Sequence, residues 1–211
     1  APRKHTKKIQ QQMNYHYKAN YLRAGLLLEE TKIIANLLKD GNDFTQIKQQ
    51  VEQNNLLNTK SQVTAKTYFS LIRSRLDLVK PEVCYLMADS DRELSSQAIF
   101  VAAIKYSPLV GDFLRLALRQ RIKEFYTDCP YSVWDAYLEQ CYTRDAEMAI
   151  FSPSSYNKLR SQTYNILIDG GFISDIKQKI LRQPFFNQTL LQLLTAQDEK
   201  YILSCLDGMI W

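Results

Sequence analysis

The segment that decides the fold runs from Asn54 to Leu76 and reads NNLLNTKSQVTAKTYFSLIRSRL. Its polar start ends at Ser61, a preferred N-cap residue, and apolar residues then recur at helical spacing, which predicts a helix over 62–79. On a helical wheel the apolar residues, among them Ala65, Phe69 and Ile72, gather on one face. The polar residues form a separate stripe that consists of Gln62, Lys66, Ser70, Arg73 and Asp77.

This polar stripe has two interpretations. Lysine and arginine side chains contact phosphate or guanine, side-chain amides contact adenine, and hydroxyl groups contact phosphates or bases. The stripe therefore suits the second helix of a helix-turn-helix bound to nucleic acid. Asp77 counts against that interpretation because a carboxylate repels phosphate, and an ordinary amphipathic helix with a solvated face has the same pattern. Arg75 points towards the apolar side and is predicted to be structural.

The rest of the chain reads as all α, because apolar residues recur at helical spacing and no segment sustains a period of two. Glycine and proline divide the pattern into separate helices. The first expected helix runs through Tyr21, Leu26 and Leu37 and ends near Gly41. Further helices are expected at 44–53, 62–79, 109–126, 152–169 and 188–206. Three more are expected to begin at Pro81, after the capping residue Asp91, and at Tyr131.

The order of these elements predicts an all-α, multi-helix bundle with helix-turn-helix-like and winged-helix-like ends. We expect a basic flexible segment at 1–16, a helix-turn-helix-like region at 17–79, a central helical bundle at 80–150 and a C-terminal region at 151–211. In the last region, SPSSYNKLRSQTYNILIDGGFI (152–173) resembles a recognition helix that runs through Gly170-Gly171 into a first wing strand. A plain helix with a glycine C-cap explains the same residues.

The charge is mildly basic, with a formal net charge of +5 and a pI near 8.9, and it is unevenly distributed. Cations including Lys7 and Lys8 precede the first acid, Glu29, whereas 128–147 holds five carboxylates against Arg144 alone. This polarity suggests one basic side of the molecule, although a solubilising tail followed by mixed surfaces has the same composition.

Two further basic faces lie on predicted helices. Lys158 belongs to a polar face with Ser154, Asn157, Ser161 and Asn165, and Arg160 flanks it. On the central helix, Arg115 and Arg119 are four residues apart and so share a face, which suits successive phosphate contacts. Asp112 and Glu124 are alternative partners for these two arginines.

Enzyme chemistry finds little support. His5 and His16 both lie in the N-terminal segment, which argues against a histidine triad or a histidine-rich metal site, and the phosphate-binding glycine motifs are absent. The four cysteines are scattered in apolar surroundings without CxxC pairing, as in buried reduced thiols. We therefore predict no catalytic residues, no metal, no cofactor and no small-molecule substrate.

The same composition predicts a cytoplasmic protein without a membrane partner. No apolar core follows the basic N-terminal residues, and the longest uncharged stretch, 183–197, is short of the roughly 20 residues that a membrane span needs. Three basic faces without active-site chemistry make nucleic acid the leading partner, and a protein with an acidic surface is the competitor.

Several stretches, in this order, resemble a known family over most of the chain. These are YLRAGLLLEETKIIANLLKDG (21–41), FTQIKQQVEQNNLLNTKSQVTAKTYFSLIRSRL (44–76), SPLVGDFLRLALR (107–119) and SSYNKLRSQTYNILIDGGFI (154–173). Together they resemble BrxA, a small component of BREX bacteriophage-exclusion systems.

The resemblance implies an all-helical protein with helix-turn-helix-like ends and a core like that of the antitermination factor NusB. It also implies a cytoplasmic, non-catalytic accessory that binds nucleic acid beside a methyltransferase, an ATPase and other BREX proteins. We expect double-stranded DNA as the ligand, bound by Lys66, Arg73, Lys158, Arg160 and the basic N-terminus. A pure assembly subunit and a NusB-like RNA binder are the alternatives.

Overall fold

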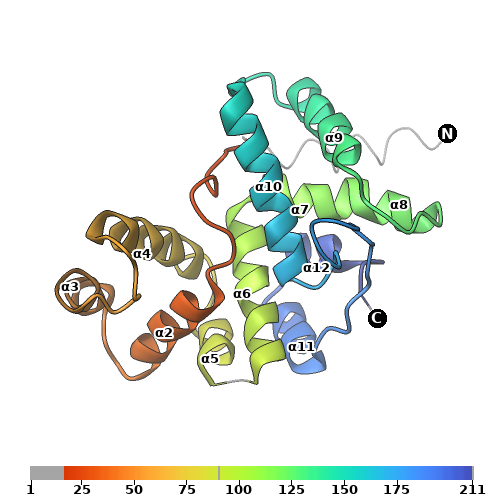
Figure 1. Cartoon of the computed structure of the whole chain (residues 1–211). Helices are drawn as coiled ribbons and strands as arrows, with labels where there is room; N and C mark the ends of the chain where they lie inside the picture. The colour runs from red at the N-terminus through yellow and green to blue at the C-terminus, as the bar shows by residue number, and fades with distance from the viewer. Residues whose placement is uncertain (1–16, 90, 211) are drawn as a thin grey trace.

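The computed structural model describes residues 17–89 and 91–210 (Figure 1), and in this part of the chain the all-α prediction is confirmed. The helices are α2 (Leu28–Lys39), α3 (Phe44–Asn54), α4 (Gln62–Leu76), α5 (Pro81–Asp89), α6 (Arg92–Tyr106), α7 (Pro108–Asp112), the π-helix η1 (Phe113–Leu118), α8 (Arg119–Lys123), α9 (Tyr131–Arg144), α10 (Pro153–Asp169), α11 (Gln188–Ala196) and α12 (Lys200–Leu206).

Helix α6 is the centre of the bundle. Its residues from Gln97 to Ile104 are all buried, as expected for a helix that other elements cover on every side. Helix α5 packs between α2 and α6, while α7 and α12 also contact α6 (Figure 1). Helices α3 and α4 stand to one side of the bundle, away from α11 and α12, and α4 contacts α6 directly (Figure 1).

The first predicted helix begins later than the sequence pattern indicated. Tyr21 and Leu26 precede α2, because Leu27 has a left-handed backbone with φ of 57° and the helix starts only at Leu28. Tyr21 is fully buried, and its hydroxyl lies 2.7 Å from the Thr163 hydroxyl of α10. These tertiary contacts hold residues 17–27 as a non-helical strap (Figure 1).

Two other predicted helices also differ in detail. The expected 109–126 helix covers 108–123 and contains the π-helical turn, and it ends early because Phe125 has a φ of 62°. The expected 188–206 helix is divided into α11 and α12 at Asp198, which has a φ of 58°. A left-handed residue cannot continue a right-handed helix, so each of these positions ends one.

Helix α10 leads into a small region of antiparallel pairing. Gly171 has the left-handed φ of 81° that the predicted glycine stop requires, and the amide of Arg182 then donates to the Phe172 carbonyl at 2.9 Å. Isolated bridges join Asp128 to Ile180 and Ile173 to Leu181, and no longer strand forms among residues 17–89 and 91–210. The winged-helix interpretation of this end stays a prediction.

Candidate nucleic-acid interface

Local capping fixes the positions of α3 and α4. Asp43 and Gln46 form a reciprocal capping box at the start of α3, with both hydrogen bonds at 2.8 Å. At the start of α4 the predicted N-cap is confirmed, since the Ser61 hydroxyl accepts from the Thr64 amide at 3.2 Å. Each cap satisfies backbone N–H groups that would otherwise lack a partner in the first turn.

The two predicted faces of α4 are confirmed. Ala65, Phe69 and Ile72 are buried against the core. Apart from Asp77, the polar stripe consists of four residues, and all four are exposed. Those four are Gln62, Lys66, Ser70 and Arg73. They lie together on one surface, while their contact with nucleic acid stays a prediction.

The stripe borders a groove between α3 and α4 of about 350 Å³. Helix α3 contributes Lys48, which the sequence analysis missed, although its spacing of four residues from Glu52 placed both on one side of α3. The groove is lined by Lys48, Val51, Glu52, Lys66, Phe69, Ser70 and Arg73. We call the exposed residues Lys48, Gln62, Lys66, Ser70 and Arg73 the α3–α4 basic face.

The cations of this face are held only loosely. Glu52 lies 3.9 Å from the Lys48 ammonium and 3.7 Å from that of Lys66, and the Arg73 Nε lies 3.6 Å from Asp77. Both Lys66 and Arg73 keep about half of their side-chain surface exposed, at 55% and 50%. Ion pairs of this kind contribute about 0–1 kcal/mol, so the cations can exchange their partners at low cost.

Arg75 belongs to the same helix and has the opposite environment. It is 2% exposed, and its Nη1 donates to the Leu26 carbonyl at 3.0 Å, which confirms the predicted structural role. Burial is the main cause that lowers its pKa to about 10. Arg73 and Arg75 are only two residues apart on α4, yet Arg73 lies on the surface and Arg75 in the core.

The polar face predicted on α10 is also exposed as expected. Ser154, Asn157, Lys158, Ser161 and Asn165 face outward, and Lys158 makes no ion pair with any described residue. The Ser152 hydroxyl caps the helix by accepting from the Ser155 amide at 3.3 Å. In Figure 1, α10 lies well apart from α4, so the two faces are separate surfaces.

Arg160, which was predicted to flank this face, turns towards α9. Its Nη1 lies 3.4 Å from the Asp135 carboxylate, and its guanidinium carbon lies 4.4 Å from the centroid of the Tyr131 ring. Tyr156 also donates to Asp135. Arg160 therefore fastens α10 to α9 and is only 22% exposed.

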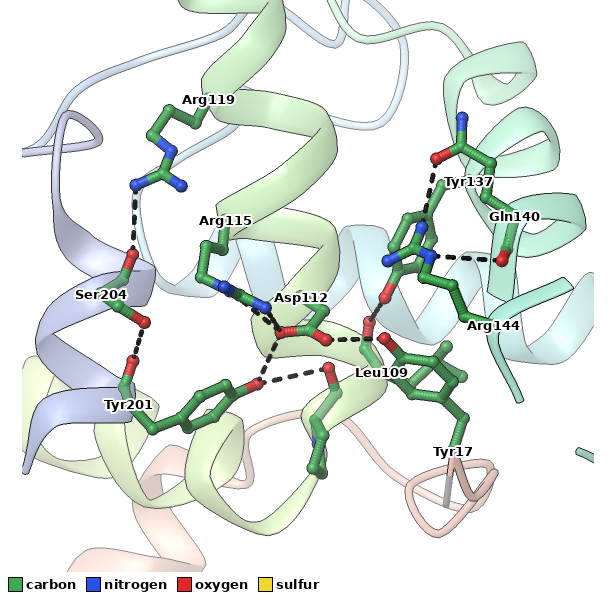
Figure 2. A network of polar contacts seen from close by, with 11 residues as sticks. Tyr17, Leu109, Asp112, Arg115, Arg119, Tyr137, Gln140, Arg144, Tyr201 and Ser204 are labelled. Atoms are coloured by element: carbon green, nitrogen blue, oxygen red, sulfur yellow. Dashed lines mark hydrogen bonds and ion pairs between the residues drawn. The ribbon is translucent and has the colours of Figure 1, made fainter. Parts of the chain in front are cut away.

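Arg115 and Arg119 share one side of the central helix, as predicted, but this side faces α12 (Figure 2). Arg115 Nη2 lies 3.0 Å from the buried carboxylate of Asp112, which also accepts from the Tyr17 hydroxyl at 2.6 Å and the Tyr201 hydroxyl at 3.3 Å. We call Tyr17, Asp112, Arg115 and Tyr201 the Asp112 network. Its members come from the 17–27 strap, α7, η1 and α12.

Arg119 is bound by the C-terminal end of α12. Its Nη1 lies 3.1 Å from the Asp207 carboxylate and 3.4 Å from the Ser204 carbonyl, and its side chain is 21% exposed. Cations stabilise the end of a helix whose last carbonyls lack partners. The alternative that Asp112 pairs with Arg115 is confirmed, whereas Glu124 instead accepts from Gln120 at 2.7 Å.

Burial and the Asp112 carboxylate together set the pKa values of Tyr17 and Arg115. The pKa of Tyr17 is raised well above 10.0, first by burial and then by the neighbouring Asp112 carboxylate. For Arg115, burial alone would lower the pKa, and the Asp112 carboxylate reverses the direction so that the pKa is raised. Both side chains therefore keep their proton and remain donors to Asp112 at neutral pH.

Metal-ligating side chains do not cluster in the described ranges. No set of three His, Cys, Asp or Glu side chains there is arranged to hold a metal ion. All four cysteines are free and buried, and burial raises the pKa of Cys84, Cys129 and Cys141 to about 11 and that of Cys205 to about 12. Lys7 and Lys8, like His5 and His16, lie outside the described residues.

Fold and surface together define an all-α protein with two exposed polar helix faces that carry cations. Within 17–89 and 91–210, no helix has the length and apolar character needed to cross a bilayer. Residues 15–198 match the BrxA family, and relatives named for it align over nearly the whole chain, so the chain belongs to the BrxA family.

The relatives support this assignment at graded distances. A protein of Paramagnetospirillum magneticum described as "BREX protein BrxA" is 38% identical over 92% of this chain and 98% of its own. One of Escherichia coli O9:H4 with the same description is 27% identical over 87% and 86%. The crystal structure of an uncharacterized protein from Magnetospirillum magneticum superposes with a TM-score of 0.83 at 35% identity, covering 91% of this chain and 98% of that chain.

Proposed function

We propose that this protein is a non-catalytic, cytoplasmic accessory of a BREX phage-defence system that binds double-stranded DNA through the α3–α4 basic face. The observation that carries the proposal is the loose pairing of Lys66 and Arg73, which lie 3.7 Å and 3.6 Å from their acids on a half-exposed surface. Each surface pair that opens costs little, and each phosphate that a cation then neutralises releases counterions from the DNA.

Helix α10 supplies a second surface in this proposal. Its exposed amides and hydroxyls, with Lys158 as the cation, are side chains that contact phosphate oxygens and base edges. Arg115, Arg119 and Arg160 contribute indirectly, because their guanidinium groups already bind acids and carbonyls that hold the helices together. The basic N-terminus, with Lys7 and Lys8, adds phosphate contacts.

The decisive experiment is a titration of labelled duplex DNA at several salt concentrations. Lys66→Glu combined with Arg73→Glu should weaken binding at low salt and reduce the slope of log affinity against log salt by about 2, at roughly 0.9 for each lost contact. Wild-type affinity in the double variant would remove the α3–α4 basic face from the interface.

A matched control separates the site from net charge. Lys80→Glu combined with Lys200→Glu removes the same charge from exposed positions outside the face. This control should bind nearly as well as the wild type, because only the general field of the protein changes. Equal losses in both double variants would mean that binding depends on net charge and not on this face.

An assembly subunit of a BREX complex is the second candidate. A groove of about 370 Å³ between η1, α8 and α9, lined by residues such as Leu116, Val133 and Ala136, is the feature that favours it. The acidic 128–147 region offers less than its sequence suggested, because Asp128, Asp135 and Asp145 bind groups of this chain. A stable complex with BREX proteins, with free protein indifferent to DNA, would favour this candidate.

RNA remains the alternative ligand to DNA. Competition of bound duplex DNA by structured RNA distinguishes them, because an RNA-binding protein would release the DNA at low competitor concentrations. We expect duplex competitor to displace the probe more effectively than RNA of equal length.

A further inference from the structure

The loop between α8 and α9 lies against the segment that follows α10, and each of these two segments carries exposed apolar side chains. The Leu181 amide donates to the Thr127 carbonyl at 2.9 Å, and the Cys129 amide donates to the Lys179 carbonyl at 2.8 Å, which joins the two segments. The exposed apolar residues around this junction are Phe125, Tyr126, Ile176 and Ile180, which we call the aromatic tip.

Phe125 occupies a backbone position that favours glycine. It has a φ of 62°, its amide donates to the Ile122 carbonyl at 3.0 Å, and the Tyr126 amide donates to the Arg121 carbonyl at 3.0 Å. This pair of hydrogen bonds is the helix-ending arrangement in which the left-handed residue is usually glycine. A bulky residue in that conformation is strained.

The folded chain gains nothing from this phenylalanine that offsets the strain. Its side chain is 92% exposed, so the ring contributes almost no buried area to the core. Strained residues that persist without a packing reason cluster at functional sites. The neighbouring Tyr126 is 51% exposed, and the Arg121 guanidinium carbon lies 4.0 Å from the centroid of its ring.

The charges around the tip favour an anionic ligand. Lys123, Lys177 and Arg182 are exposed, and none of them makes an ion pair within 4 Å with a residue that the structure describes. The nearby carboxylates are Glu124, Asp128 and Asp175, and that of Glu124 accepts from the Gln120 side-chain amide at 2.7 Å. Asp128 binds Arg121 at 2.8 Å, and Asp175 accepts backbone amides at 2.7 Å.

We propose that the aromatic tip binds single-stranded nucleic acid, with an unpaired base stacked on the Phe125 ring and phosphates bound by Lys123 and Lys177. Exposed aromatic rings beside unpaired cations are the combination with which proteins hold single strands without sequence preference. The central area of a protein–protein interface is instead depleted of charged residues. The aromatic tip is separate from the α3–α4 basic face. The proposal for the tip holds whether or not the α3–α4 basic face binds duplex DNA.

Phe125→Gly provides an unusual test because it removes the ring and relieves the backbone. The probe is a fluorescein-labelled oligothymidylate of about 16 nucleotides, followed by anisotropy at low salt. We expect Phe125→Gly to weaken binding at least about fivefold, the loss of one stacked base. Its melting temperature should stay equal to that of the wild type or rise by about 2 °C.

Four comparisons make the result specific. Phe125→Asn also tolerates the left-handed backbone and should lose affinity in the same way, whereas Ile150→Ala removes a side chain that is 90% exposed elsewhere and should change nothing. Lys123→Gln combined with Lys177→Gln should reduce the salt slope for the single strand by about 1.4. Duplex binding should respond to Lys66→Glu with Arg73→Glu and not to Phe125→Gly.

Several outcomes would overturn the proposal. One is a wild-type protein that ignores the oligonucleotide, and another is a Phe125→Gly variant that binds it with unchanged affinity. A third is a Phe125→Gly variant that loses duplex and single strand equally, which would make the tip part of the duplex interface. Loss of self-association in that variant, with oligonucleotide binding intact, would assign the tip to a second copy of the chain.

Discussion

Two clusters of cations on helices of this protein have opposite environments. On α4, Lys66 and Arg73 keep about half of their surface exposed and face acids at 3.6–3.7 Å. On the helix from 108 to 123, Arg115 and Arg119 are only 23% and 21% exposed and face oxygens at 3.0–3.1 Å. Spacings of seven residues on α4 and four residues on the 108–123 helix both place the two cations on one face, so the difference lies in what packs against each helix.

The contrast shows that a basic stripe is available to a ligand only when its cations are exposed and only loosely paired with acidic side chains of the fold. Arg115 has a buried carboxylate beside it, and Arg119 receives Asp207 from a segment 88 residues away. The cations of α4 face the surface acids Glu52 and Asp77, and the Arg73 guanidinium carbon also lies 5.1 Å from the centroid of the Phe44 ring. We therefore expect substitutions of Arg115 and Arg119 to change stability, and substitutions of Lys66 and Arg73 to change binding.

The largest expected effect follows removal of the buried carboxylate. Asp112→Ala leaves Arg115 and the hydroxyls of Tyr17 and Tyr201 without their shared acceptor, which should lower the free energy of unfolding by about 3 kcal/mol. Urea denaturation followed by circular dichroism measures this change. Asp77→Ala, the matched loss of an exposed acid on α4, should stay within about 0.5 kcal/mol, and similar effects for both would erase the contrast.

Alkaline pH should weaken the region around the Asp112 network. Burial raises the pKa of Tyr17 above the ordinary value of 10.0, so its stabilising contribution is present below pH 10 and is lost as pH rises further. Such a group lowers the free energy of unfolding by about 1.4 kcal/mol per pH unit in that range. Tyr21 and the buried thiols act in the same direction.

The variant Tyr17→Phe identifies the contribution of one group. It removes a titrating hydroxyl, so the decline in stability between pH 10 and higher pH should be less steep than in the wild type. Urea midpoints measured at several alkaline pH values give the two slopes. Parallel slopes would mean that Tyr17 does not titrate with unfolding.

Within α4, Arg75→Ala should cost about 1 kcal/mol of stability. It removes the buried stem of the side chain and leaves the Leu26 carbonyl without its donor, although the loss of a buried charge offsets part of this cost. Arg73→Ala, two residues away, should change stability by less than about 0.5 kcal/mol. Thermal denaturation of the two variants side by side compares them, and the reverse ranking would contradict the assigned environments.

Much of the fold was predictable because its signals are local. Ser61 and Asp91 cap the helices that they were expected to cap, with the Asp91 carboxylate accepting from the Leu94 amide at 2.9 Å, and Gly171 provides the expected left-handed stop. These features depend on hydrogen bonds between residues no more than a few positions apart. The exposed faces of α4 and α10 follow from the same local periodicity.

The remainder depended on distant segments. Tyr21 looked helical, but its contact with Thr163, 142 residues away, fixes the strap before α2. Arg119 looked available for phosphate until α12 placed Asp207 beside it. Phe125 and Asp198 adopt left-handed backbone conformations that end helices, and their residue types did not predict these conformations. Sequence periodicity therefore predicted the exposed faces of α4 and α10 correctly, and it overestimated how many of the basic side chains have no partner within the fold.

The most direct test of the contrast compares the salt dependence of duplex DNA binding in Arg73→Ala and Arg115→Ala. We expect Arg73→Ala to reduce the slope of log affinity against log salt by about 0.9 at nearly wild-type stability. Arg115→Ala should leave the slope unchanged while lowering the melting temperature. Equal slopes for Arg73→Ala and the wild type, or a reduced slope for Arg115→Ala, would contradict the central claim that exposed, loosely paired cations bind DNA and tightly paired ones do not.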